Sequence, residues 1–416
     1  MLEPKGIALK AGMVEPKGSA LKAGMAEPKG IALLGSTGSI GVQALEVIEA
    51  FPDRFRVVAL ACRSAADAVV EQARRHSPQL VGVSDSGAAA QVSRALRGTP
   101  TEVLSGPDAM VRCALHPAAD LVLAAASGIA GLPPVWEAVR AGKRVALANK
   151  EPLVAAGHLI MAEAERTGAE IIPVDSEHSA IFQSLLGHDR SAVARVILTA
   201  SGGAFRDMPA EELRDVTPEQ ALAHPTWKMG SKVTVDSATL FNKGLELIEA
   251  RWLFGFAPDQ LDVVLHRESI VHSLVEFLDG SVLAHLANPD MRLPIQFALS
   301  YPERLPRSEA PPDLAALGAL HFAPLSLERW PCVRLAREAL AAGGTAPAVL
   351  NAADEVAVSW FLEGRVRFTD IPDIIESALA GCEAAPGDSI EAILDADART
   401  RARLEKDQDR WMSSPA

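Results

Sequence analysis

The feature that most constrains the fold is an alternation of short apolar runs with longer amphipathic stretches between residues 31 and 174. The runs lie at 31–34, 57–60, 80–83, 102–104, 121–124, 145–148 and 171–174. Between them, stretches such as 65–76 and 152–167 have apolar residues at helical spacing. Strands that alternate with helices predict a parallel sheet with helices on both faces, which is a doubly wound α/β domain.

The rest of the chain predicts two further domains. Strand-like runs at 193–199, 262–265 and 282–286, with one long helix expected over 238–254, indicate an α+β central domain. Five prolines between 301 and 325 mark a linker, and helical stretches near 332–342, 347–363, 371–382 and 389–408 indicate a C-terminal helical bundle. We therefore expect domains at 25–174, 175–300 and 326–412, joined by the linker 301–325.

The first 36 residues contain a near-repeat of twelve: MLEPKGIALKAG, MVEPKGSALKAG and MAEPKGIALLGS. Three copies of twelve are too short for a solenoid, and only the third copy continues into a convincing strand. We expect residues 1–24 to be a disordered extension and the folded protein to begin near Met25. Because Glu, Lys, Pro and Gly recur throughout this region, we expect no signal peptide.

Composition and charge exclude several classes of function. The net charge is −13 and aromatic residues make up only 5% of the chain, so a role in binding nucleic acid is not expected. The four cysteines lie far apart without a CxxC pair, which favours free thiols in a reducing compartment over a disulfide framework or a zinc ribbon. No apolar stretch reaches membrane-spanning length. We expect a cytoplasmic protein that does not enter a membrane.

Small, polar or charged residues follow five of the predicted strands. These segments are 35–41 (GSTGSIG), 62–64 (CRS), 126–128 (ASG), 149–151 (NKE) and 175–178 (DSEH). In an open parallel sheet, ligands bind beyond the carboxyl ends of the strands. The pattern therefore predicts an active site along that edge.

The first of these segments suits a dinucleotide. Gly35, Gly38 and Gly41 have GxxGxxG spacing, which lets the backbone approach a pyrophosphate at the start of a helix. The alternative is an ordinary tight turn. At the end of the second strand Arg63 and Ser64 stand where NAD sites carry a carboxylate, which favours NADPH because a guanidinium suits a 2′-phosphate. A solvated surface arginine is the alternative.

Two carboxylates follow the seventh predicted strand. In extended backbone Asp175 and Glu177 would point to the same side and repel unless a cation lies between them. Glu246 is a candidate third ligand from the long helix, although an ordinary exposed helix carboxylate is the alternative. An all-oxygen set favours Mg²⁺ or Mn²⁺ over zinc.

Two later segments suit an anionic substrate, and a loop-like segment lies between them. Residues 199–204 and 236–243 carry the hydroxyls, amide and lysine that bind a phosphate, and the loop-like segment 224–230 between them has the composition of a lid. A histidine or tryptophan in such a loop can equally be structural.

Six motifs together resemble one family. They read GSTGSIG (35–41), NKE (149–151), PVDSEHSAIFQ (173–183), HPTWKMG (224–230), VDSATLFNKGLELIEARWLF (235–254) and PDMRLPI (289–295). The chain resembles the 1-deoxy-D-xylulose 5-phosphate reductoisomerases, the NADPH-dependent enzymes of the non-mevalonate isoprenoid pathway. The resemblance implies a homodimer with a Rossmann-like N-terminal domain. It also implies rearrangement and reduction of 1-deoxy-D-xylulose 5-phosphate to 2-C-methyl-D-erythritol 4-phosphate.

The resemblance assigns roles to individual residues. The implied metal ligands are Asp175, Glu177 and Glu246, and the implied phosphate ligands are Ser201, Ser237, Asn242 and Lys243. Lys150, Ser176 and His224 would contact the rest of the substrate, and Trp227 and Met229 would belong to a mobile lid over 201–231. NADPH would lie on Thr37, Gly38, Ser39, Ile40, Asn149, Glu151 and Gly230, in addition to Gly35. The pair Arg63-Ser64 departs from the Gly-Lys/Ser-Asn of several members, so the 2′-phosphate contact is expected from Arg63.

We expect the bound cation to polarise the substrate ketone, and Glu177 and Lys150 to share proton handling; the sequence does not assign the base. Two alternatives stay open. A plain NADPH-dependent dehydrogenase of the semialdehyde or homoserine type would share only the cofactor domain and would not need the three carboxylates. A non-catalytic protein that senses NADPH would bind the cofactor without turnover.

Overall fold

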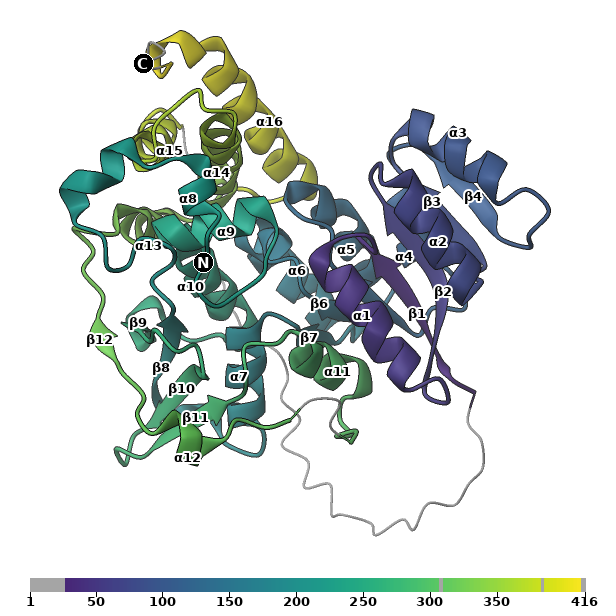
Figure 1. Cartoon of the computed structure of the whole chain (residues 1–416), viewed down its shortest axis with the longest axis horizontal. Helices are drawn as coiled ribbons and strands as arrows, with labels where there is room; N and C mark the ends of the chain where they lie inside the picture. The colour runs from purple at the N-terminus through teal and green to yellow at the C-terminus, as the bar shows by residue number, and fades with distance from the viewer. Residues whose placement is uncertain (1–26, 307–309, 383–384, 413–416) are drawn as a thin grey trace.

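The computed structural model describes residues 27–306, 310–382 and 385–412. The near-repeat at 1–24, expected to be a disordered extension, lies outside the described residues. The predicted doubly wound domain is confirmed, because seven parallel strands form one sheet in the order β4-β3-β2-β1-β5-β6-β7 (Figure 1). They are β1 (Lys29–Leu34), β2 (Phe55–Cys62), β3 (Leu80–Val83), β4 (Glu102–Ser105), β5 (Leu121–Ala124), β6 (Arg144–Leu147) and β7 (Ile171–Pro173).

The strand order reverses between β1 and β5, and this reversal determines where a ligand can bind. From β1 the chain runs outward to β4 and then returns to β5 beside β1, so the crossovers of the two halves cover opposite faces of the sheet. The helices are α1 (Ser39–Ala50), α2 (Ala66–His76), α3 (Ser86–Ala95), α4 (Ala109–Ala114), α5 (Leu132–Arg140) and α6 (Glu151–Thr167). A crevice opens at such a switch point, outside the carboxyl ends of the strands.

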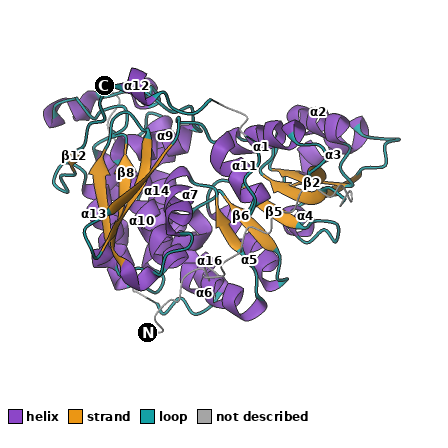
Figure 2. Ribbon diagram, turned by 90° about the horizontal axis from the view of Figure 1, so that it is seen from below, coloured by secondary structure: helices purple, strands orange, loops and turns teal. Residues whose placement is uncertain are grey.

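A second sheet of mixed direction forms the central domain, in the order β11-β10-β8-β9-β12 (Figure 2). Its strands are β8 (Val193–Ala200), β9 (Leu261–Leu265), β10 (Val271–Phe277), β11 (Val282–Leu286) and β12 (Ala323–Pro324). The sequence pattern missed β10, because the polar residues His272 and Ser273 are buried in it and break the alternation that marks a strand. The proline-rich segment 301–325 contributes β12, which pairs with β9, and the short helix α12 (Leu314–Leu317).

The prediction of one long helix over 238–254 is wrong, because two helices meet there. Helix α9 (Ser231–Thr239) ends just before Leu240, and α10 (Phe241–Phe254) begins just after it. The φ of Leu240 is 56°, which is left-handed. A leucine rarely adopts this conformation, and its buried side chain shows that tertiary packing holds it there. The sequence has neither glycine nor proline at this position to signal the break.

The remaining helices complete the molecule. Helix α7 (Ser176–Leu185) and α10 pack on one face of the second sheet, α8 (Pro218–Ala221) precedes α9, and α11 (Arg292–Ser300) packs on α1. The predicted C-terminal bundle is confirmed as α13 (Pro331–Ala342), α14 (Ala346–Leu362), α15 (Asp370–Ala380) and α16 (Ile390–Lys406). It packs on α10 through α13 and on α6 and α9 through α14 (Figure 1). Among the described residues, no helix combines the length and the apolar character needed to cross a membrane.

The buried strand β1 gives a test of the fold. Leu33 is fully buried between two neighbouring strands, so we expect Leu33→Ala to lower the free energy of unfolding by about 2–5 kcal/mol, through lost burial and the cavity left behind. Val42 on α1 is 43% exposed, and Val42→Ala should change it by less than about 0.5 kcal/mol. Denaturant unfolding of both variants measures the difference. Equal losses would contradict the central position of β1.

Candidate active site

A cleft of about 780 Å³ lies where the carboxyl ends of the first sheet meet the central domain. It is lined by α1, the residues after β6 and β7, the end of β8, the segment 226–230, helices α9 and α10, strand β10 and the start of α11. Of the residues singled out in the sequence, those that line it are Ser39, Ile40, Lys150, Asp175, Ser176, Glu177, Ser201, Trp227, Met229, Gly230, Ser237, Asn242, Lys243 and Glu246. The strand-end residues and the anion-binding segments therefore meet in one cavity.

Three carboxylates converge in this cleft. Oxygens of Asp175, Glu177 and Glu246 lie within 4.8 Å of one another. The predicted geometry of the first two was wrong, because the backbone is not extended: Asp175 caps α7 and Glu177 lies in the first turn of that helix. Glu246 comes from α10, where it is fully buried.

Two lysines partly neutralise the carboxylates. The Lys150 ammonium lies 2.5 Å from Asp175 and 3.0 Å from Glu246, and the Lys243 ammonium lies 2.6 Å from Glu177 and also contacts Glu246. Three carboxylates and two ammonium groups leave one formal negative charge. Burial, with the Glu177 carboxylate beside it, raises the pKa of Glu246 to about 7, so the buried cluster is short of positive charge. Such a set of oxygen donors fits a hard divalent cation such as Mg²⁺ or Mn²⁺.

A buried histidine–glutamate pair connects α7 and α10, the two helices that carry the carboxylates. His178 on α7 and Glu249 on α10 are both buried, with Nδ1 and Oε2 3.4 Å apart. His178 Nε2 lies 2.9 Å from the backbone oxygen of Glu246, so the ring donates a proton there. This contact fixes the register of α7 against α10, and with it the distance between Glu177 and Glu246.

Groups that suit a phosphate lie beside the carboxylates. Ser201 follows β8, Ser237 lies on α9, and Asn242 and Lys243 open α10 just after the break at Leu240. The Asn242 side-chain oxygen accepts a hydrogen bond from the Lys150 ammonium at 2.8 Å. Hydroxyl, amide and ammonium donors therefore surround one region of the cleft.

His224 does not line the cleft but organises the segment 224–230, most of which does. Its Nδ1 accepts the backbone N–H groups of Thr226 at 3.1 Å and Trp227 at 2.9 Å, so Nε2 carries the proton and donates to Ser201 Oγ at 3.0 Å. The Trp227 ring lies 6.0 Å from the ring of His272 on β10. The histidine thus ties the segment 224–230 to the loop after β8.

The glycine-rich turn has the geometry that its sequence predicts. Gly35 has a φ of 80°, and a Cβ there would lie 2.5 Å from the Ala125 backbone oxygen. A Cβ at Gly41 would lie 2.3 Å from the backbone oxygen of Gly35, so α1 starts against the turn only because glycine occupies that position. Thr37, Gly38 and Ser39 are at least partly exposed on this turn.

The other predicted cofactor residues fall into two groups. Arg63 and Ser64 are exposed at the end of β2, outside the lining of the cleft. Asn149 and Glu151 are buried: Glu151 accepts the Gly128 N–H at 3.1 Å and also contacts the Asn149 amide. They therefore hold the loop after β5 in place.

Sequence reasoning missed several lining residues, among them Gln43, Ser269, His272, Asp290 and Arg292. His272 lies in the strand that the pattern did not reveal. Asp290 and Arg292 stand in the PDMRLPI motif, which was noted without a role. Gln43 lies on α1, two residues after the glycine-rich turn ends. This proximity to the turn was the one sequence signal that could have identified it as a lining residue.

A doubly wound sheet with a glycine-rich first turn, open to a cleft of carboxylates and ammonium groups, defines an α/β oxidoreductase of the dinucleotide-binding type. The comparisons identify the family. The model of 1-deoxy-D-xylulose 5-phosphate reductoisomerase matches residues 31–157, that of its C-terminal domain matches 171–254, and that of the DXP reductoisomerase C-terminal domain matches 286–403. The chain belongs to the 1-deoxy-D-xylulose 5-phosphate reductoisomerase family.

Relatives agree over nearly the whole chain. The reductoisomerase of Thermomicrobium roseum is 55% identical over 375 residues, which are 89% of this chain and 96% of that protein. That of Aromatoleum aromaticum is 52% identical over 376 residues, 89% of this chain and 93% of that protein. The Zymomonas mobilis enzyme in complex with NADPH is 40% identical with a TM-score of 0.85, covering 91% of this chain and 98% of that one. A reductoisomerase in complex with NADPH, fosmidomycin and magnesium is also 40% identical, with a TM-score of 0.87 and coverage of 91% and 99%.

The contacts of His224 predict its titration. Burial, and then the Arg206 charge, lower the pKa of His224 from 6.5 to about 4. We expect the ring to stay neutral, with the proton on Nε2, until the pH falls to about 4, and ¹⁵N NMR of labelled histidine can follow both. Because the unfolded chain takes up this proton near pH 6.5, folding loses stability as the pH falls from 6.5 towards 4. A His224 midpoint near 6.5 would contradict the observed hydrogen bonds.

Proposed function

We propose that this cleft binds 1-deoxy-D-xylulose 5-phosphate beside NADPH and a divalent cation, and that the residues described above carry out its conversion. As a member of the family, the chain is an NADPH- and metal-dependent oxidoreductase that converts this substrate in isoprenoid precursor synthesis, to 2-C-methyl-D-erythritol 4-phosphate. The observation that carries the residue assignment is the meeting of Asp175, Glu177 and Glu246 with two lysines at the open end of the first sheet. In this division residues 25–174 bind the cofactor, 175–300 hold the metal and substrate, and 326–412 support them.

Asp175, Glu177 and Glu246 would hold Mg²⁺ or Mn²⁺, since their oxygens converge and the cluster carries a net negative charge. When bound, the cation supplies a Lewis acid for the substrate ketone and its neighbouring hydroxyl. Lys150 remains an ammonium donor: burial alone would lower its pKa, but Asp175 and Glu246 raise it well above the ordinary value. Lys150 therefore remains a cation that donates hydrogen bonds, and we assign proton acceptance to Glu177, the less buried of the two carboxylates that Lys243 contacts.

Ser201, Ser237, Asn242 and Lys243 would hold the substrate phosphate, because their donors share one region of the cleft. Ser176 lies beside the carboxylates, and Trp227 and Met229 line the cleft from the segment that His224 organises. Anchoring the phosphate at one end provides binding energy away from the reacting carbons, which helps to orient them. Closure of the lid over 201–231 would exclude water from the rearranged aldehyde.

The cofactor would lie along the turn 35–41 and across the open edge towards Gly230. It supplies the hydride that reduces the aldehyde. Thr37, Gly38, Ser39 and Ile40 can approach a pyrophosphate because the turn has glycines where a side chain would clash. The exposed Arg63 and Ser64 are placed for the 2′-phosphate at the end of β2. Asn149 and Glu151 act there by shaping the loop after β5.

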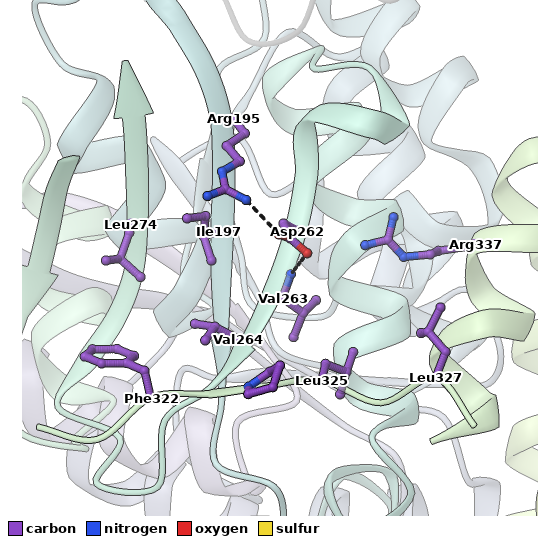
Figure 3. A pocket seen from close by; sticks show the side chains of 11 residues that line it. Arg195, Ile197, Asp262, Val263, Val264, Leu274, Phe322, Leu325, Leu327 and Arg337 are labelled. Carbon is purple, nitrogen blue, oxygen red and sulfur yellow. Dashed lines mark hydrogen bonds and ion pairs between the residues drawn. The ribbon is translucent and has the colours of Figure 1, made fainter. Parts of the chain in front are cut away.

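We also propose that the protein is a homodimer that uses the outer face of the second sheet. While α7 and α10 cover one face, the other carries a cavity of about 630 Å³ (Figure 3). Apolar side chains of Ile197, Val264 and Leu274 line it, and Arg195 bridges Asp262 and Glu276 beside them. An apolar centre with a charged rim is typical of a subunit interface, and a twofold axis would bring such a face against its own copy.

A cytoplasmic location fits the same picture. All four cysteines are free thiols, as expected in a reducing compartment, and the substrate and NADPH are metabolites. The net charge of −13 argues against a nucleic-acid partner.

The metal assignment gives the first test. We expect purified chain to oxidise NADPH when the substrate and Mg²⁺ or Mn²⁺ are added, and to stop on addition of EDTA. Glu246→Gln should lower kcat/KM at least about 100-fold, because it removes a ligand and a charge, whereas the exposed Glu338→Gln should leave it unchanged. Turnover that survives EDTA would remove the metal role and favour a plain dehydrogenase. NADPH binding without any turnover would favour a non-catalytic protein.

The dimer has its own test. Leu274→Asp would place an unpaired charge in the proposed interface and should weaken dimerisation at least about 100-fold, measured by light scattering across a dilution series. Leu115→Asp is a matched control, because Leu115 is a surface leucine (37% exposed) of the first domain. If wild type is monomeric at micromolar concentration, or Leu274→Asp dimerises as wild type does, this face is not the interface.

A further inference from the structure

A buried charge cluster joins the segment 224–230 to the C-terminal domain. Lys232 lies in the first turn of α9, two residues after this segment ends. Its ammonium is 2.7 Å from Asp236 on the same helix and 2.7 Å from Asp354 on α14. The Asp236 and Asp354 side chains are 1% and 0% exposed, so both carboxylates are removed from water. The pair Lys232–Asp354 links positions 122 residues apart in the sequence.

The cluster also touches the helix that carries the substrate-facing residues. The Lys232 ammonium lies 5.4 Å from the centre of the Phe241 ring, and Phe241 directly precedes Asn242 and Lys243 on α10. One ammonium therefore meets α9, α10 and α14. A charge that contacts three helices fixes the start of α9, and hence the end of the segment 224–230, relative to the cleft.

The next residue of α14, Glu355, contacts the loop after β5, on the side of the cleft where the cofactor is proposed to bind. Glu355 Oε1 accepts the backbone N–H of Ile129 at 3.2 Å, in the loop after β5. The same loop is held from the other side by Glu151, which accepts the Gly128 N–H. Two adjacent carboxylates of the C-terminal domain thus contact two different segments: the start of α9, which follows the segment 224–230, and the loop after β5.

The Lys232–Asp354 pair is the main compensation for burying Asp354. Within the described part of the chain, neither Asp354 oxygen accepts a well-aligned hydrogen bond, so the carboxylate depends on the ammonium. A buried ion pair of this kind adds little to stability compared with apolar packing, but it tolerates few alternative geometries. The Lys232–Asp354 pair therefore contributes more to fixing the position of α9 against α14 than to the free energy of unfolding.

We propose that Asp354 is a positioning residue of the C-terminal domain, which through Lys232 anchors the segment 224–230 in the orientation that closes over the substrate. His224 fixes one end of this segment to Ser201, and Lys232 fixes the other to α14. The inference rests on the proposed function only in taking 224–230 to cover the substrate. The anchor itself does not depend on which substrate binds.

The direct test is the mobility of the segment in the full-length chain without ligands. Lys228 is exposed in the middle of the segment, and trypsin cleaves after lysine. We expect Asp354→Asn to speed cleavage after Lys228 at least about 5-fold, measured by mass spectrometry of the fragments that end and begin there. The control is Thr400→Val: Thr400 is also buried in the C-terminal domain, but its hydroxyl donates to the Ala396 backbone oxygen within α16, and the cleavage rate of this variant should equal that of wild type.

Kinetics separate positioning from a merely structural role. If closure is impaired, Asp354→Asn should raise KM for 1-deoxy-D-xylulose 5-phosphate at least about 5-fold and lower kcat by a smaller factor. Lys232→Arg keeps the charge but replaces a compact ammonium by a planar group that cannot sit between both carboxylates, and it should show the same pattern. It also provides the test if Asp354→Asn does not fold.

Two results would overturn the inference. One is cleavage after Lys228 at the wild-type rate in a folded Asp354→Asn or Lys232→Arg variant. The other is a change in Thr400→Val as large as that in Asp354→Asn, which would mean general loosening of the C-terminal domain. If the wild-type chain does not turn over the substrate, the proposed function fails, while the digestion still decides whether the anchor exists.

Discussion

The structure depends on a balance of buried charge at the junction of two sheets. Asp175 and Glu177 enter the cleft at the start of α7 and Glu246 enters from α10, and none of the three could share so small a volume without cations beside it. Lys150 and Lys243 balance most of this negative charge, and in the proposed site a divalent cation would balance the remainder. Because Lys150 comes from the first sheet and the other residues from the second domain, the same balance that suits catalysis also holds the domains together.

Much of the fold could be predicted because it rests on local patterns. Six of the seven strands of the first sheet are buried almost throughout and read as apolar runs, while the edge strand β4 is largely exposed. Gly35 and Gly41 mark the turn where backbone approaches backbone. The two expectations that failed depend on tertiary packing. Leu240 adopts a left-handed conformation that nothing in its neighbours signals, and β10 buries His272, which disguises it as a loop.

The candidate site was predictable in its members but not in its geometry. Lys150 and Asp175 could be predicted because they are polar residues that directly follow strands, and the carboxyl ends of parallel strands share one edge of the sheet. Glu246 looked like any helix carboxylate, since a sequence does not show that the break at Leu240 turns α10 towards the cleft. Glu151 illustrates the reverse case: it stands at a strand end, yet it is buried and holds the Gly128 loop. Polar residues at the carboxyl edge of a sheet predict roughly where a site lies. The burial of each side chain then decides which of these residues can face a ligand.

The C-terminal helices show why a domain can matter to the cleft although none of its described residues lines it. Helix α14 packs on α6, which follows Lys150, and on α9, which follows the closing segment. Most of the helix is apolar and buried, but Asp354 pairs with Lys232 on α9 and Glu355 accepts the Ile129 N–H in the loop after β5, while Asn351 donates to Glu355. A purely structural support could make the same contacts with apolar side chains at lower desolvation cost. Charged groups at this interface are therefore best explained by what they position: the loop after β5 on one side, and the base of the closing segment on the other.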